Sequence, residues 1–139
     1  MNYASFIAAV EQDAHIPRKR AEQAARATLA TLDERLAPRL ARDVAARLPD
    51  ELRPLLATET TAERFDSDEF VYRVARREGM TVAAAERDAR AVFAALGQAV
   101  SAEELADVAS ELPTDFQRLV VAAELAAIVA RSDSPRRMR

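Results

Sequence analysis

The strongest constraint on this chain is an internal repeat. Shifted by 64 residues against itself, the sequence aligns residues 3–56 with residues 67–120 without a gap, and 15 of the 54 pairs are identical. Many matched residues are apolar and recur at helical spacing, as Phe6 does with Phe70. Segments that reuse apolar positions in this way predict two copies of one helical module that share a core.

Composition favours helix in both copies. Half of the residues are hydrophobic, 31% are charged and only 2 are glycine. Because few positions carry the entropy cost of glycine, the intrinsic helix propensity is high. We expect four helices in the first copy, at about 3–14, 18–36, 38–47 and 49–56, and four in the second, at about 67–78, 82–99, 102–111 and 113–131.

Proline placement distinguishes the two copies. Proline is tolerated at the first position of a helix, where its missing N–H group is not needed. We place Pro38, Pro49 and Pro113 at such positions. Pro54 should truncate the last helix of the first copy, because proline breaks a helix interior. Arg118 occupies the matching position in the second copy, so that helix can continue for several turns.

These elements predict an all-α fold, a compact helical bundle of two tandem pseudo-repeats with about four helices each. We expect residues 1–139 to form a single domain, with repeat one at about 1–57, repeat two at about 64–131 and a flexible basic tail at 132–139. The predicted core consists of apolar residues at equivalent positions of the two copies: Phe6, Val10, Leu29, Leu32, Val44 and Leu48, with Phe70, Val74, Phe93, Leu96, Val108 and Leu112.

Composition also excludes several classes of protein. The chain has 0 cysteines, so disulfides, thiolate nucleophiles and cysteine–zinc sites are excluded. The amino terminus lacks the basic and apolar regions of a signal peptide, and the apolar stretch 119–130 is too short to cross a bilayer. We therefore expect a cytoplasmic protein with no membrane contact. The net charge of −3 argues weakly against a dedicated nucleic-acid binder.

Each copy contains three motifs in the same order. A Phe-x-x-x-Val helix is followed by Ala-Glu-x-x-Ala-Arg-Ala, and then by Asp-Val-Ala-x-x-Leu-Pro. In the second copy Arg64, Phe65 and Asp66 precede the first motif, and Arg76-Arg77-Glu78-Gly79 follows it. This succession, over about residues 3–120, resembles the bacterial and archaeal domain-of-unknown-function family 2267. The resemblance implies a compact helical fold and brings no activity, cofactor or catalytic residue.

No catalytic, cofactor-binding or metal-binding constellation is identified. His15 is the only histidine, and its repeat counterpart is Gly79. We expect both to end a helix in the left-handed conformation, which glycine adopts freely and histidine tolerates. Asp66, Asp68 and Glu69 lack the mid-loop glycine of a calcium loop. Asp66 and Glu69 instead have the spacing of a capping box, in which side chains satisfy the first free N–H groups of a helix.

Ser101 and Glu104 have the same capping-box spacing at the start of a later helix. Two short basic runs could neutralise phosphates, although no aromatic residues alternate with them to stack bases. A solvated helix start and a frayed terminus are the favoured explanations of these runs. The candidate nucleic-acid contacts in these runs are Arg18, Lys19, Arg20, Arg136, Arg137 and Arg139.

The last predicted helix is apolar on two sides. At 100° per residue, one face carries Phe116, Leu119, Val120, Ala123 and Ala127, and a second face carries Val121, Leu125, Ile128 and Val129. One face is enough to cover the core of a module. The second face either packs on the first module or forms an exposed interaction surface. Val121, Leu125, Ile128 and Val129 are therefore the candidate interface.

We expect a non-enzymatic helical interaction module that binds an unknown protein partner or self-associates as a homo-oligomer. The alternative is a nucleic-acid-associated protein that uses the basic residues near 18–20 and the C-terminal tail. A third hypothesis is a bundle that holds an apolar ligand between the modules. An enzyme ranks last, because it would have to rely on carboxylates alone.

Overall fold

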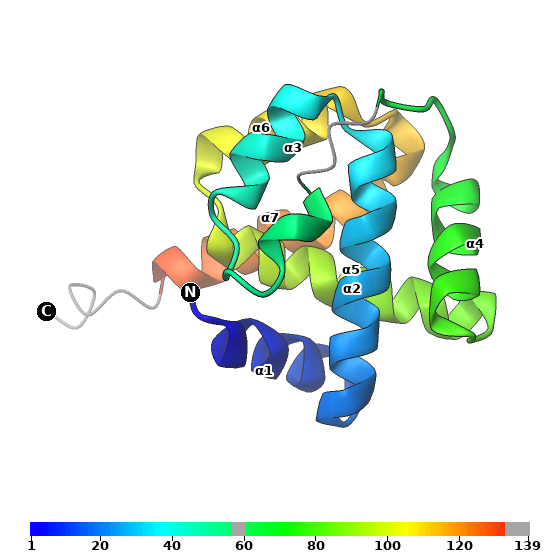
Figure 1. Ribbon diagram of the computed structural model, residues 1–139. Coiled ribbons are helices and arrows are strands. Elements are labelled where there is room, and N and C mark those ends of the chain that lie inside the picture. Colours follow the sequence, from blue (N-terminus) through cyan, green and yellow to red (C-terminus); the bar gives the residue numbers. More distant parts are fainter. Residues whose placement is uncertain (57–60, 133–139) are drawn as a thin grey trace, which may run out of the picture.

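The computed structural model describes residues 1–56 and 61–132, and all regular secondary structure within these ranges is helical. The order is α1 (Tyr3–Ala14), α2 (Arg18–Arg35), α3 (Pro38–Ala45), a 3-10 helix η1 (Arg53–Leu56), α4 (Ser67–Glu78), α5 (Val82–Ala99), α6 (Ala102–Glu111), a 3-10 helix η2 (Thr114–Phe116) and α7 (Gln117–Ser132) (Figure 1). The all-α fold class is thereby confirmed. The tail predicted at 132–139 lies outside the described residues, apart from Ser132 at the end of α7.

Two helix ends have the left-handed conformation predicted from the sequence. His15 ends α1 with φ 56° and ψ 51°, and Gly79 ends α4 with φ 69° and ψ 36°. In both, the capping N–H group donates to the carbonyl four residues earlier, on Glu11 and Ala75 respectively. A helix that ends this way satisfies a free carbonyl and turns the chain sharply.

The predicted capping boxes are realised to different extents. Ser101 accepts from the N–H group of Glu104, and the Glu104 carboxylate accepts from the N–H group of Ser101, so this capping box is complete. Asp66 accepts from the N–H group of Glu69, but the Glu69 carboxylate accepts from Arg73 at 2.8 Å instead of returning to Asp66. The second box is therefore only half formed, because a cation on the next turn competes for the carboxylate.

The segments after Pro49 and Pro113 differ from the prediction. Pro38 is the first residue of α3, as predicted, but Pro49 and Pro113 precede short 3-10 helices and do not open α-helices. The carbonyl of Pro49 accepts from both Leu52 and Arg53, which forms a turn. Pro54 has no N–H group to continue an α-helical ladder, so this segment ends as η1.

The two halves of the chain pack into one continuous core. α1 packs on α2 and on α5, and α4 packs on α5 and on α2, so the first helix of each half contacts the long helix of both halves. All twelve residues of the predicted core are buried. The ring of Phe70 lies at the centre of an aromatic cluster, with ring centroids 5.9 Å from Phe93 and 5.5 Å from Phe116.

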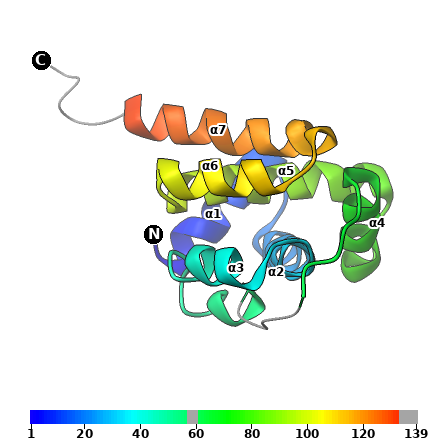
Figure 2. The ribbon, with the colours of Figure 1, turned by 90° about the horizontal axis from the view of Figure 1, so that it is seen from above.

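α7 lies at one edge of the molecule, beside α5 and α6 (Figure 2). The backbones of α7 and α5 come close together at Gly97. A Cβ atom added to Gly97 would lie 2.1 Å from the carbonyl oxygen of Ala123, on α7. Only a residue without a side chain allows the two backbones to come this close, which explains a glycine inside a long helix. This contact fixes where α7 crosses α5 and so positions the candidate interface.

Candidate binding groove along α7

The two predicted faces of α7 have opposite environments. Phe116 of η2 and Leu119, Val120, Ala123 and Ala127 of α7 are buried. The second face is exposed: Val121 keeps 37% of its surface accessible, and the remaining three side chains keep 52–58%, namely Leu125, Ile128 and Val129. These side chains are therefore not buried against the first half of the chain, which was the alternative predicted from the sequence.

Exposed apolar side chains are concentrated on α7 and beside it. Among the described residues, seven large hydrophobic side chains are exposed: Met1, Tyr72, Val82, Val121, Leu125, Ile128 and Val129. Four of them are on α7, and Met1 lies beside its C-terminal half. Single exposed apolar residues are ordinary on protein surfaces, whereas a contiguous group indicates a binding surface.

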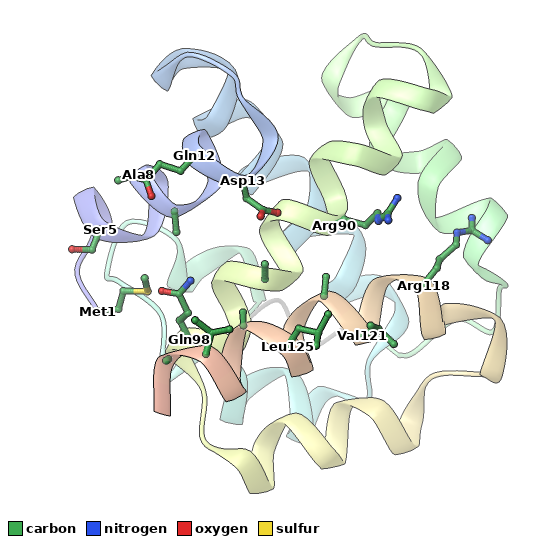
Figure 3. Close-up of a pocket in the computed structure, with 16 residues that line it drawn as sticks. Met1, Ser5, Ala8, Gln12, Asp13, Arg90, Gln98, Arg118, Val121 and Leu125 are labelled. Atoms are coloured by element: carbon green, nitrogen blue, oxygen red, sulfur yellow. The ribbon is translucent and has the colours of Figure 1, made fainter. Parts of the chain in front are cut away.

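α7 forms one wall of an open groove. α1 forms the opposite wall and α5 the floor, and the cavity volume is about 910 Å³ (Figure 3). Alanines from all three helices line much of it: Ala8, Ala9, Ala94, Ala122, Ala126 and Ala130. Because these side chains are small, another backbone could approach the groove closely. Leu125 and Val129 line the α7 wall, so the exposed face and the groove form one surface.

Polar side chains lie at the rim. Figure 3 shows Arg90 and Arg118 toward one end of the groove and Met1 and Gln98 toward the other. Arg118 already has partners, since its guanidinium lies 3.1 Å from Asp68 and 3.2 Å from Glu86. The rim therefore offers hydrogen-bonding groups around an apolar centre, which is the usual composition of a protein-binding surface.

Of the basic residues predicted as nucleic-acid contacts, the three that the structure describes do not form one exposed surface. Arg18 pairs with Glu22 at 3.7 Å, and Lys19 is exposed. Arg20 turns inward, where its guanidinium lies 2.6 Å from the fully buried carboxylate of Asp88. A cation held this way is not available to a phosphate. Arg136, Arg137 and Arg139 lie outside the described residues, so their part of the hypothesis stays a prediction.

The structure shows a buried charged cluster that the sequence analysis missed. Glu78, Asp88 and Arg20 meet where α4, α5 and α2 come together. Burial raises the pKa of Glu78 to about 8, and the hydrogen bond and negative charge of Asp88 add to the shift. A signal was present in the predicted repeat: the residues 64 positions away are the buried alanines Ala14, Ala24 and Ala84. Each charged residue thus matches a small apolar one in the other copy.

A second ion network joins α4 to α2 on the surface. Arg73 and Arg77 both contact the carboxylate of Glu34, at 3.1 Å and 2.8 Å. The hydrogen bond from Arg77 lowers the pKa of Glu34, with a further contribution from Arg73. Arg73 also lies over the ring of Phe65, 4.0 Å from its centroid. These contacts are fully explained by helix packing and need no ligand.

Within residues 1–56 and 61–132, no three side chains of the metal-binding types lie close enough to hold an ion. No helix in those ranges combines the length and apolar character needed to cross a bilayer. His15 lies exposed at the end of α1, where its backbone conformation accounts for its position.

The fold and the groove define an all-α protein with an open groove, lined in large part by apolar side chains, between its first and last α-helices. The family model described as "Uncharacterized conserved protein (DUF2267)" matches residues 3–119, and the chain belongs to this family. A comparison with curated proteins finds no match. The match ends at Leu119, so most of α7, including its exposed apolar face, lies beyond the matched residues.

Proposed function

We propose that this protein is a non-enzymatic interaction module whose groove between α1 and α7 binds an amphipathic helix of a protein partner or of a second copy. One observation carries the proposal: Val121, Leu125, Ile128 and Val129 are exposed together on a helix that already buries another face. Helices bind apolar grooves through side chains spaced three and four residues apart. Val121, Leu125 and Ile128 have this spacing on α7 itself.

The shape of the groove also supports a helical ligand. Its alanine lining leaves room for a backbone, and Leu125 and Val129 provide larger side chains for interdigitation on one wall. Arg90, Gln12 and Gln98 at the rim can orient the ligand through polar contacts.

We place this activity in the cytoplasm and ascribe the architecture to duplication of one module. The equal lengths of α1 and α4, 12 residues each, and of α2 and α5, 18 residues each, support that origin.

Paired variants test the groove. We expect the double substitution Leu125→Asp with Val129→Asp to leave the protein folded and to abolish binding, because both side chains are more than half exposed. Leu119→Asp should instead unfold the protein, since Leu119 is fully buried. Val82→Asp is the matched control, because Val82 is equally exposed but is not part of the groove. Thermal melting reports folding, and light scattering against concentration reports self-association.

A partner from another protein requires a different measurement. Because the chain has 0 cysteines, Ala126→Cys introduces one attachment site on the groove wall for a photo-crosslinker. The proposal is supported if the crosslinks map to an amphipathic helix and are lost in the double variant. It is wrong if the protein stays monomeric and yields no such crosslink. It is also wrong if Val82→Asp weakens binding as much as the double variant does.

A further inference from the structure

A buried pair of carboxyl groups lies away from the groove, where three helices meet. Glu78 is the last residue of α4, Asp88 lies in the second turn of α5, and Arg20 lies near the start of α2. Asp88 is fully buried, and its Oδ2 atom accepts from Nη2 of Arg20 at 2.6 Å. The Glu78 carboxyl group lies within hydrogen-bonding reach of Asp88. The pair therefore joins the end of α4 to the two longest helices.

The hydrogen bonding at this cluster is incomplete if both acids are ionised. Three carboxyl oxygens are buried without a donor: Oδ1 of Asp88 and both Oε atoms of Glu78. A buried acceptor without a partner is costly, and two adjacent buried carboxylates repel each other. One added proton removes the repulsion between the two carboxylates and supplies Asp88 with a donor, although one Oε atom of Glu78 stays without one. Glu78 then donates an O–H to Asp88, and the remaining negative charge is matched by Arg20.

The position of Glu78 at the end of α4 also favours the protonated form of its carboxyl group. A carboxylate at the C-terminal end of a helix faces the negative end of the helix dipole, which disfavours its charge. The charged groups around Glu78 are Arg20 from α2 and Arg87 and Asp88 from α5. Nη2 of Arg20 is occupied by Asp88, the buried Nε of Arg20 has no acceptor, and Arg87 is exposed to solvent. Neither cation donates a hydrogen bond to the Glu78 carboxyl group.

We propose that Glu78 and Asp88 share a single proton, and that this proton holds the end of α4 against α5 and α2. Mildly alkaline pH then removes the proton and releases the end of α4. The cluster is independent of the groove and of the function proposed for it. The pKa of about 8 for Glu78 is consistent with this arrangement.

The sign of the pH effect follows from proton binding. The pKa of Glu78 is raised from 4.5 to about 8 on folding, so the folded protein binds more protons than the unfolded chain between these values. The contribution of Glu78 to the stability of the folded protein is therefore fully present below about pH 4.5. It is lost as the pH rises toward and through about 8. This loss of stability falls in the pH range in which cells operate, because the Glu78 carboxyl group is half deprotonated near pH 8.

Thermal unfolding between pH 6 and pH 9 tests the proposal. We expect the Tm of the natural protein to fall by roughly 5–10 °C more than that of Glu78→Gln. The glutamine amide donates to Asp88 at every pH and cannot titrate. Glu103→Gln, which removes an exposed carboxylate from α6, is the control and should behave like the natural protein. Equal pH dependence of the natural protein and Glu78→Gln would overturn the proposal.

Two further measurements keep the test decisive if Glu78→Gln folds poorly. Carbon-detected NMR of the natural protein follows the Glu78 carboxyl directly, and we expect its midpoint near pH 8; a midpoint near the ordinary 4.5 refutes the shared proton. Hydrogen exchange reports the local effect. The N–H groups of Gly79 and Met80, which both donate to the carbonyl of Ala75, should lose protection above pH 8 before the core does. Uniform loss of protection across all helices would show that the end of α4 is not released separately.

Discussion

The contact between Gly97 and α7 makes a sharp prediction about helix packing. Replacing Gly97 with alanine puts a Cβ atom 2.1 Å from the carbonyl oxygen of Ala123, 2.8 Å from its carbonyl carbon and 2.9 Å from its Cα. All three atoms belong to the backbone of α7, so no side-chain rotation can relieve the overlap. The helix must move by roughly 1 Å at the crossing, because close-packed interiors have no empty space to absorb the methyl group.

Two opposing effects set the size of the change. Overpacking a core costs about 1–3 kcal/mol, and the backbone clash places Gly97→Ala at the upper end of that range. Alanine in a helix interior gains about 1 kcal/mol over glycine. We therefore expect a net loss of about 2 kcal/mol in the free energy of unfolding. Urea denaturation should show a midpoint lower by about 1 M, with little change in slope.

Two companion variants identify the cause. Gly79→Ala has no atom within 4 Å of its added Cβ, so it measures only the strain of placing alanine at φ +69°. Ala123→Gly should not rescue Gly97→Ala, because the clash is with the backbone of Ala123 and not with its methyl group. If Gly97→Ala is neutral or stabilising, or if Ala123→Gly restores it, the close approach of α5 and α7 is wrong.

Two further predictions concern the core and the end of α1. Leu32→Ala and Leu96→Ala should each lower the free energy of unfolding by about 2–5 kcal/mol in denaturant titrations, because both leucines are buried; a neutral result for both would contradict the shared core. His15→Asn should leave the thermal midpoint nearly unchanged, since asparagine tolerates the left-handed conformation, whereas the β-branched His15→Val should lower it. Equal midpoints for the asparagine and valine variants would show that the backbone at this position does not govern stability.

The helices and the core were predictable because the signals for them are local. Apolar spacing identified the buried residues, and the spacing of Ser101 and Glu104 marked the start of α6. The exchange of His15 for Gly79 between the predicted copies marked two left-handed helix ends. Each of these features depends on a few neighbouring residues, so no knowledge of the tertiary structure was needed.

The groove was predictable only in part. The 100° periodicity of α7 identified Leu125 and Val129 as surplus apolar residues, and the structure places both at the surface. The opposite wall was not predictable, because α1 and α7 are more than 100 residues apart in sequence and are brought to the same groove by packing on α5. The buried carboxyl pair was not predictable for the same reason. Glu78 and Asp88 look like ordinary surface charges until the packing of α4 against α5 is known.

The asymmetry between the two halves gives a reason for the length of α7. In the first half, Pro54 confines the corresponding segment to the short helix η1, and Leu56 is fully buried at its end. In the second half, Arg118 allows α7 to continue to Ser132, yet Ala127 is the last residue of this helix described as buried. A helix needed only to cover the core could end there. Ile128 and Val129 instead continue at 52% and 57% exposure, so their apolar character is not explained by folding and is what the proposed ligand on that face requires.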